Sequence, residues 1–268
     1  MESARDPVIT LTAASIIATL ASGALVGLLL AVFGGGGSVL AAPLLLYVVG
    51  VRDPHIAIGT SSAAVAANAA INLFGHWRGG RVKWPCAITF ALAGLIGSFA
   101  GSTLAKAVSG THLLLAFAFA MAAIALSMLR RPKNEGDPNV HLNAQLMLRL
   151  TPLGLLTGLA AGFFGIGGGF LIVPGLMLAT GMTIANATAS SLVSVAIFGM
   201  ATSINYAASD LVDWRLAGLL LVGGALGGGL GLVIAKQLTT HALLARRSFA
   251  ALVLAVAAYV AWRATAAL

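Results

Sequence analysis

The chain has 268 residues, of which 59% are hydrophobic and 8% are charged, and its formal net charge is +8. Soluble domains carry about 25% charged residues, so this composition excludes a soluble protein and predicts an all-α polytopic membrane protein. The basic residues lie between apolar runs, where they orient the chain and meet anionic membrane lipid, and they do not indicate a nucleic-acid partner. Cys86 is the only cysteine, which excludes an internal disulfide and a multi-cysteine metal or redox site.

Five apolar helical runs are expected in the first part of the chain, at 8–33, 39–50, 56–77, 84–108 and 111–130. The run 39–50 covers only about 18 Å, which is half of a bilayer. A polar linker containing prolines follows from Arg130 to Asn139, and a short amphipathic segment follows it. We therefore expect a first transmembrane repeat at 1–131, and a linker with an amphipathic segment at 132–150.

The pattern then restarts, with runs at 151–164, 170–181, 183–207, 214–238 and 242–262. The segment 158–174 nearly repeats the sequence of 27–43, and Trp214 matches Trp84 in its position within the copy. The run 170–181 is again too short to span. We expect 151–268 to be a second transmembrane repeat, so that the protein has two homologous halves, each with long transmembrane helices and one half-span element broken by glycine.

Glycine clusters precede both short runs at matching places, and glycine-rich backbone holds a helix poorly. Lipid cannot satisfy the backbone groups that such a break frees, so each cluster must be buried in protein or line a wet cavity. Matched interruptions in two halves indicate a transporter's binding site near the bilayer midplane, and the N-terminus of the following short helix favours an anion. The expected site residues are Gly34, Gly35, Gly36, Gly37 and Ser38 in the first copy and Gly165, Gly167, Gly168 and Gly169 in the second.

The orientation of the two copies depends on what the glycine break does. A break within one crossing gives four crossings per copy in the same orientation, whereas a break at the tip of a re-entrant hairpin gives three crossings and inverted copies. Both arrangements place ten of the 15 Lys and Arg residues on one face and five on the other, so the positive-inside rule does not choose between them. Inversion gathers the basic loop from His76 to Lys83, the central linker and the segment 236–247 on one face, and for that reason we favour inverted repeats.

Hydroxyl and amide side chains recur at matching places in the helix after each short run, where they can complete the hydrogen-bond shell of an oxyanion. They are Thr60, Ser61, Ser62 and Asn72 in the first copy and Thr188, Ser190, Ser191 and Asn205 in the second. The alternative is that these groups bond one helix to another, as they often do in membranes. The glycines at 94, 97, 101, 224, 227 and 231 have the spacing of close helix packing, and we expect Lys106 to extend to the headgroups.

Enzyme signatures are absent from the sequence. The glycine clusters do not satisfy the dinucleotide fingerprint, because Phe170 replaces its last glycine. No phosphate loop, nucleophile elbow or pair of carboxylates stands at catalytic spacing. We therefore expect no enzyme activity, no cofactor and no metal site.

The doubled motif resembles a known family. Phe33-Gly-Gly-Gly-Gly37 with Pro43 and Gly59-Thr-Ser61, echoed by Phe164-Gly-Ile-Gly-Gly-Gly169 with Pro174 and Ala189-Ser-Ser191, look like the repeat of the TauE/SafE sulfite-exporter family of membrane permeases. The resemblance implies movement of sulfite, sulfoacetate or other organosulfonates across the bacterial inner membrane. The second copy reads Thr-Ala-Ser-Ser where the first reads Gly-Thr-Ser-Ser, so equal roles for the halves do not follow. With only Cys86, the chain looks unlike the related thiosulfate importers, which rely on cysteines.

The expected function is therefore secondary transport of a small sulfur-containing anion by alternating access about the two glycine breaks, with a proton or sodium ion as a possible coupling ion. The alternatives are an anion channel with the same site and a transporter of another small carboxylate or oxyanion. The sequence does not give the direction of transport or the oligomeric state.

Overall fold

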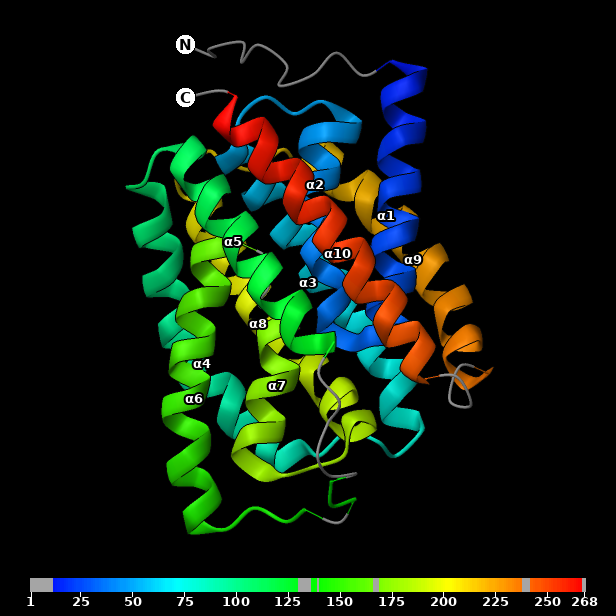
Figure 1. The fold of residues 1–268 in the computed structure, drawn as a ribbon, viewed down its shortest axis with the longest axis vertical. Helices are drawn as coiled ribbons and strands as arrows, with labels where there is room; N and C mark the ends of the chain where they lie inside the picture. Colours follow the sequence, from blue (N-terminus) through cyan, green and yellow to red (C-terminus); the bar gives the residue numbers. More distant parts are fainter. Residues whose placement is uncertain (1–11, 130–135, 139, 166–168, 238–241, 267–268) are drawn as a thin grey trace.

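A computed structural model describes residues 12–129, 136–138, 140–165, 169–237 and 242–266. These residues form helices and no named strand, as the composition predicts (Figure 1). In chain order the elements are α1 (Ala13–Phe33), the 3₁₀ helix η1 (Gly34–Leu40), α2 (Ala41–Leu44), the π-helical turn η2 (Leu45–Val49), α3 (Pro54–Arg78), α4 (Trp84–Lys106), α5 (Gly110–Leu129), α6 (Ala144–Phe164), α7 (Gly169–Thr180), α8 (Ile184–Ala207), α9 (Trp214–Gln237) and α10 (Ala242–Thr265). Within this part of the chain, eight helical segments are long and apolar enough to cross a bilayer.

The first glycine run is a point where the chain reverses. A Cβ atom on Gly37 would overlap the backbone of Leu29 and Leu30 in α1, so the two arms of the chain on either side of the glycine run lie in direct contact there. Further from the tip, Ala18 of α1 packs against a cluster that contains Val49. α1 therefore packs against the following segment both close to the glycine run and far from it. This arrangement makes α1 and the segment from η1 to η2 a helical hairpin rather than one continuous crossing.

The second glycine run is also the tip of a hairpin. α6 ends at Phe164, and Gly175 of α7 lies against Thr157 of α6, with 3.2 Å between a Cβ built on the glycine and the Thr157 hydroxyl. α6 begins at Ala144, earlier than expected, because the Asn143 side chain accepts a hydrogen bond from the amide of Leu146 and caps the helix there. The amphipathic segment before residue 151 is therefore the first part of α6.

Two helix pairs cross so closely that only glycine fits between them. In the α1–α9 pair, Gly23 meets the backbone of Leu220 and Gly27 meets that of Gly224. In the α4–α6 pair, Gly158 meets the backbone of Gly94, and Gly101 meets that of Leu159. The packing interpretation of the spaced glycines in α4 and α9 is thus confirmed, since a side chain at these positions would push the helices apart.

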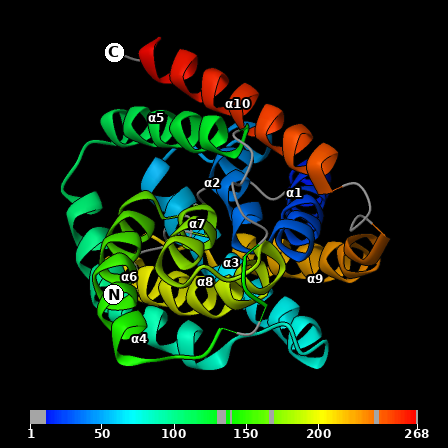
Figure 2. The same ribbon diagram turned by 60° about the horizontal axis from the view of Figure 1, so that its bottom comes forward.

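The helices α3 and α8 form the centre of the molecule and run in opposite directions. Gly59, near the start of α3, lies against Tyr206 at the end of α8, whereas Gly199 of α8 lies against Ser62 and Ala66 of α3. Figure 1 shows that α1 begins at the top of the view and α6 at the bottom, so the two hairpins enter from opposite ends of the molecule. Figure 2 shows α5 and α10 side by side as a layer that covers the hairpins.

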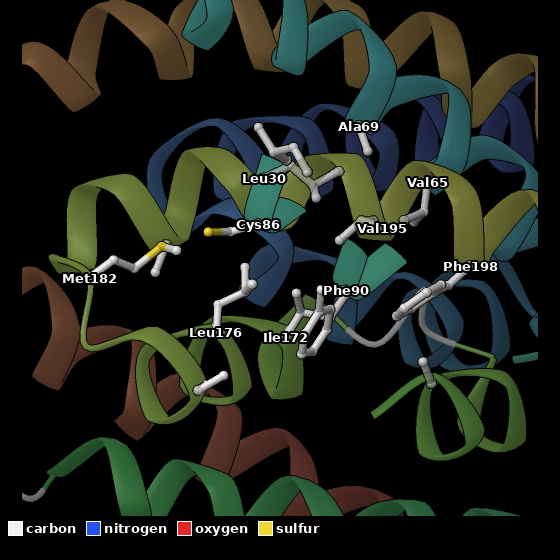
Figure 3. Close-up of a cluster of buried hydrophobic side chains, with 14 of the residues drawn as sticks. Leu30, Val65, Ala69, Cys86, Phe90, Ile172, Leu176, Met182, Val195 and Phe198 are labelled. Atoms are coloured by element: carbon white, nitrogen blue, oxygen red, sulfur yellow. The ribbon is translucent and has the colours of Figure 1, made fainter. Parts of the chain in front are cut away.

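One large hydrophobic cluster joins elements from both parts of the chain (Figure 3). Leu30 of α1 and Phe90 of α4 contribute from the first part, and Ile172, Leu176 and Phe198 contribute from the second. Cys86 is fully buried in this cluster, so its role is packing, as its position near a helix start predicts. The burial of side chains from both halves in one cluster fixes the two hairpins relative to each other.

Candidate functional site

The first glycine run leaves α-helical geometry at Gly34, whose φ of 62° and ψ of −143° lie outside the region that other residues adopt readily. The whole of Gly34–Leu40 is buried. We expected non-helical backbone here, and the structure differs: the α-helix ends at Phe33, but the glycines continue as the tighter 3₁₀ helix η1. Gly34, with its positive φ, turns the chain out of α1. The 3₁₀ helix that follows is wound more tightly than an α-helix.

The second glycine run begins in the same way, because Gly165 has a φ of 64° and ends α6. A Cβ atom on Gly165 would overlap the side chain of Ile58 in α3. Two expected site residues, Gly167 and Gly168, lie outside the described residues. Gly169 is the first residue of α7, which matches the short half-span helix that the sequence predicts.

Two serines connect each glycine break to the helix that follows the other break. The amide of Gly35 donates a 3.1 Å hydrogen bond to the hydroxyl of Ser191 in α8. The hydroxyl of Ser62 in α3 donates a 2.6 Å bond to the carbonyl of Gly165. Ser62 and Ser191 stand at the same place in their copies, so the two contacts are reciprocal. Thr188 adds to the first of them, since its carbonyl accepts the Ser191 hydroxyl at 2.8 Å and lies against Gly34.

The sequence of the chain matches that of known membrane proteins. The family model for the sulfite exporter TauE/SafE matches residues 19–260, which is most of the chain. The chain belongs to the TauE/SafE family. A probable membrane transporter protein of Xylella fastidiosa is 49% identical over 259 residues, which cover 96% of this chain and 99% of that protein. A probable membrane transporter protein of Bacillus subtilis is 25% identical over 252 residues, which cover 85% and 92% of the two chains. No solved structure matches the chain significantly.

Family membership and the eight apolar helices together make this TauE/SafE protein an integral, multi-pass membrane protein and a membrane transporter rather than an enzyme. The described residues contain no cluster of His, Cys, Asp and Glu that could hold a metal ion. The side-chain hydrogen bonds described at and beside the two glycine breaks involve serine hydroxyls and the His76 imidazole. Within the described part of the chain, none of these bonds comes from a Lys, Arg, Asp or Glu side chain.

The remaining expected hydroxyls of this TauE/SafE protein bond to backbone. The Ser38 hydroxyl donates to the carbonyl of Gly35 at 2.8 Å, and the Ser61 hydroxyl donates to that of Ile58 at 3.1 Å. The Thr60 hydroxyl accepts from the amide of Asp213 at 2.9 Å, just before α9, and the Ser190 hydroxyl accepts from the amide of Lys83 at 2.9 Å, just before α4. Thr60 and Ser190 thus hold the loops that start the next helices.

The side-chain amides of the two expected asparagines bond within or between helices rather than to a glycine break, and that of Asn72 donates to the carbonyl of Asn68 at 3.0 Å. Asn205 is about 21 Å further along α8 than Ser191, and its side-chain amide donates to the hydroxyls of Ser102 and Thr103 in α4 at 2.6 and 2.8 Å. The ammonium of Lys106 donates to both the carbonyl and the side-chain oxygen of Asn205. Lys106 therefore caps the end of α8, because the last carbonyls of that helix need donors, and its expected contact with the headgroups stays a prediction.

Aromatic pairs cover both hairpin tips, and sequence reasoning missed their partners. Phe33 stacks on Phe249 of α10 with ring centroids 4.4 Å apart, and Phe164 lies 6.1 Å from Phe117 of α5. The Phe before each glycine run was visible as part of the doubled motif. Phe117 and Phe249 sit at the same place in α5 and α10 but carry no local signal, so only the packing of the α5–α10 layer over the hairpins reveals them.

Proposed function

We propose that this TauE/SafE protein is a secondary transporter that carries a small sulfur-containing anion, such as sulfite or an organosulfonate like sulfoacetate, across the bacterial inner membrane. The reciprocal pair of contacts between Gly35 and Ser191 and between Ser62 and Gly165 carries the proposal. The two glycine breaks share one buried region, in which each break is held by a helix of the other half. A substrate bound there contacts both halves at once.

The proposed mechanism is alternating access between two inverted repeats. Three features support it: the hairpins enter from opposite ends of the molecule, the corresponding helices α3 and α8 are antiparallel, and α1 packs on α9 as α6 packs on α4. Rocking one inverted half against the other exposes a site between them to each side in turn.

Recognition of the anion rests on neutral donors. When the halves separate, the Gly35 amide loses the Ser191 hydroxyl, and a substrate oxygen takes that hydroxyl's place as acceptor. The Ser62 hydroxyl, no longer bonded to the Gly165 carbonyl, is then free to donate to the same anion, and the Ser191 hydroxyl can donate to it by leaving the Thr188 carbonyl. Because such neutral hydrogen bonds contribute only about 0.5–1.5 kcal/mol each, we expect modest affinity. The proposal that the substrate contains sulfur rests on membership of the TauE/SafE family.

Counterflow in proteoliposomes tests this function. Vesicles loaded with unlabelled sulfoacetate or sulfite should take up the labelled anion, with a rate that saturates as its concentration rises, and sulfate and taurine serve as competitors. An anion channel with the same site would instead give a current that does not saturate in the same range and shows no stimulation by anion on the other side. If no sulfur-containing anion is exchanged but a carboxylate such as acetate is, the substrate is a carboxylate.

A further inference from the structure

His76 is a buried histidine that the site described above does not use. Its side chain is only 3% exposed, near the end of α3. Its Nε2 atom lies 3.2 Å from the carbonyl oxygen of Ala31 in α1. A carbonyl can only accept, so Nε2 carries a proton and donates. The other ring nitrogen, Nδ1, is buried and has no partner, and it therefore offers a free lone pair inside the protein.

The position of His76 is linked directly to the first glycine break. In a continuous α-helix, the amide of Gly35 would donate to the carbonyl of Ala31, four residues earlier. In this structure the Gly35 amide donates to Ser191 instead, and the Ala31 carbonyl accepts from His76. One helical hydrogen bond has thus been replaced by two bonds to other helices. His76 stabilises the broken end of α1, and Ser191 stabilises the start of η1.

Two asparagines continue the polar face of α3 from His76 toward its middle. Asn68, Asn72 and His76 are spaced by four residues, so they lie in one row on the helix. Asn68 and Asn72 are each 1% exposed, and the Oδ1 atom of each is buried without a partner. Gly224 and Gly228 of α9 lie against these two side chains. Buried acceptors of this kind need a hydrogen-bond donor such as water, so the row is suited to carrying water to the imidazole.

We propose that His76 binds the proton that is transported together with the anion, and that Asn68 and Asn72 hold the water that delivers it. The proposal rests on the proposed transport function. A proton passes from water to Nδ1, the imidazole becomes an imidazolium, and Nε2–H stays on Ala31. When the anion leaves, the proton returns from Nδ1 to water. The imidazolium supplies the positive charge that the neutral site lacks, and it lies at the C-terminal end of α1, where the helix dipole favours a cation.

The charge around His76 decides when it can hold a proton. Arg81, in the loop after α3, is a cation whose field opposes a positive charge on the ring, so the imidazolium is favoured when the negatively charged substrate is bound nearby. The facing helix α1 has no charged residue between Ala13 and Phe33. On α9, Arg215 is at the other end of the helix, and the side chain of Lys236 lies outside the described residues. The described part of the row has no carboxylate that could accept the proton in place of His76.

The test compares wild type with His76→Gln in proteoliposomes. Glutamine keeps a donor for the Ala31 carbonyl but cannot take up a proton. If one proton moves with each anion, a gradient of one pH unit drives an accumulation of about tenfold. Wild type should accumulate labelled sulfoacetate in response to this gradient, and its counterflow should rise as pH falls. H76Q should lose the accumulation, and its counterflow should be weaker than that of wild type and independent of pH. His112→Gln is the matched control, because His112 is exposed and bonds to Ser109.

Solid-state NMR of the imidazole nitrogens gives a readout that does not depend on the substrate. The spectrum of wild type in lipid should contain a resonance that converts from the Nε2-protonated neutral form to the imidazolium as pH falls and that is missing from H76Q. The proton site is overturned if this resonance stays neutral at every pH at which the protein is folded, if H76Q still accumulates anion, or if a sodium gradient replaces the pH gradient. Absence of counterflow for any anion would contradict the transport function itself, while leaving the NMR result to decide the proton site.

Discussion

The hydroxyl of Ser62 donates a 2.6 Å hydrogen bond to the carbonyl of Gly165, 103 residues further along the chain. Ser191 makes the corresponding contact with Gly35, in which its hydroxyl accepts from the amide. Each glycine break therefore depends on a serine from the other half of the protein. In the proposed alternating-access mechanism the two bonds would break when the halves separate, and they would then set part of the free energy of that step.

Removing these hydroxyls should destabilise the protein. Ser191→Ala leaves the buried amide of Gly35 without a partner, which costs about 1–3 kcal/mol of unfolding free energy. Ser62→Ala does the same to the Gly165 carbonyl, and we expect both variants to lower transport per folded molecule. Thermal unfolding in detergent and counterflow measure the two effects. Ser127→Ala is the control, since its exposed hydroxyl bonds within α5. Unchanged stability in both site variants would contradict the assigned contacts.

Alanine substitutions at Gly34 and Gly36 should show which glycine is required by its backbone conformation and which has room for a side chain. Gly34→Ala places a Cβ at a positive φ and 2.6 Å from the carbonyl of Thr188, so we expect loss of folded protein or of transport. Gly36→Ala should be tolerated, because its Cβ would lie 3.7 Å from the Phe249 ring at ordinary contact distance. Gly36→Leu should displace that ring and stop transport. Yield of monodisperse protein and uptake per folded molecule decide the comparison, and equal behaviour of the two alanine variants would refute it.

Leucine at two glycines of α9 should give opposite results. Gly227 lies against the backbone of Ala24 in α1, so Gly227→Leu forces the helices apart and should cost at least about 1–3 kcal/mol. Gly229 has nothing within 4 Å of its built Cβ, and Gly229→Leu should leave expression and thermal stability near wild type. If Gly227→Leu folds normally but stops transport, the α1–α9 crossing lines the substrate path rather than a packed contact.

Lys106 should matter for stability more than for substrate. Its ammonium donates to Asn205 and to the hydroxyl of Ser209 at 2.8 Å. Lys106→Met removes these bonds from the end of α8, and hydrogen bonds to charged groups contribute about 1.5–3 kcal/mol. We expect a lower unfolding temperature with an unchanged transport rate per folded molecule. A loss of saturable uptake at unchanged stability would instead assign Lys106 to the anion.

Local signals were enough to predict much of the fold. The ends of α3, α4 and α8 lie within two residues of the expected runs, because polar, Pro or Gly residues lie close to most of these ends and the runs themselves carry almost no charge. The doubled motif predicted two breaks in the helices at the glycine clusters, and it left open whether the chain reverses there. The α5–α10 layer and the pairing of each hairpin with the far half depend on long-range packing, which no local pattern encodes.

Predictions for individual side chains were less complete for the same reason. Hydroxyls near a glycine break were expected to share one role, but Ser62 and Ser191 bond to the breaks, whereas Thr60 and Ser190 bond to loops. Each step of one residue along a helix turns the side chain by about 100°, so neighbouring hydroxyls meet different elements. The bonds of Lys106 to the end of α8 depend on the crossing of α4 and α8, which no local pattern gives.

The central claim is that the anion binds between the two glycine breaks, and a selenium analogue of the transported anion tests it most directly. Selenite can replace sulfite, and anomalous scattering from a crystal of the complex locates the selenium atom. We expect a single strong selenium peak, close enough to the Gly35 amide and the Ser62 or Ser191 hydroxyl for the selenite oxygens to form hydrogen bonds with them. A peak elsewhere, for example beside Lys106 and Asn205, at a selenite concentration that inhibits transport would contradict it.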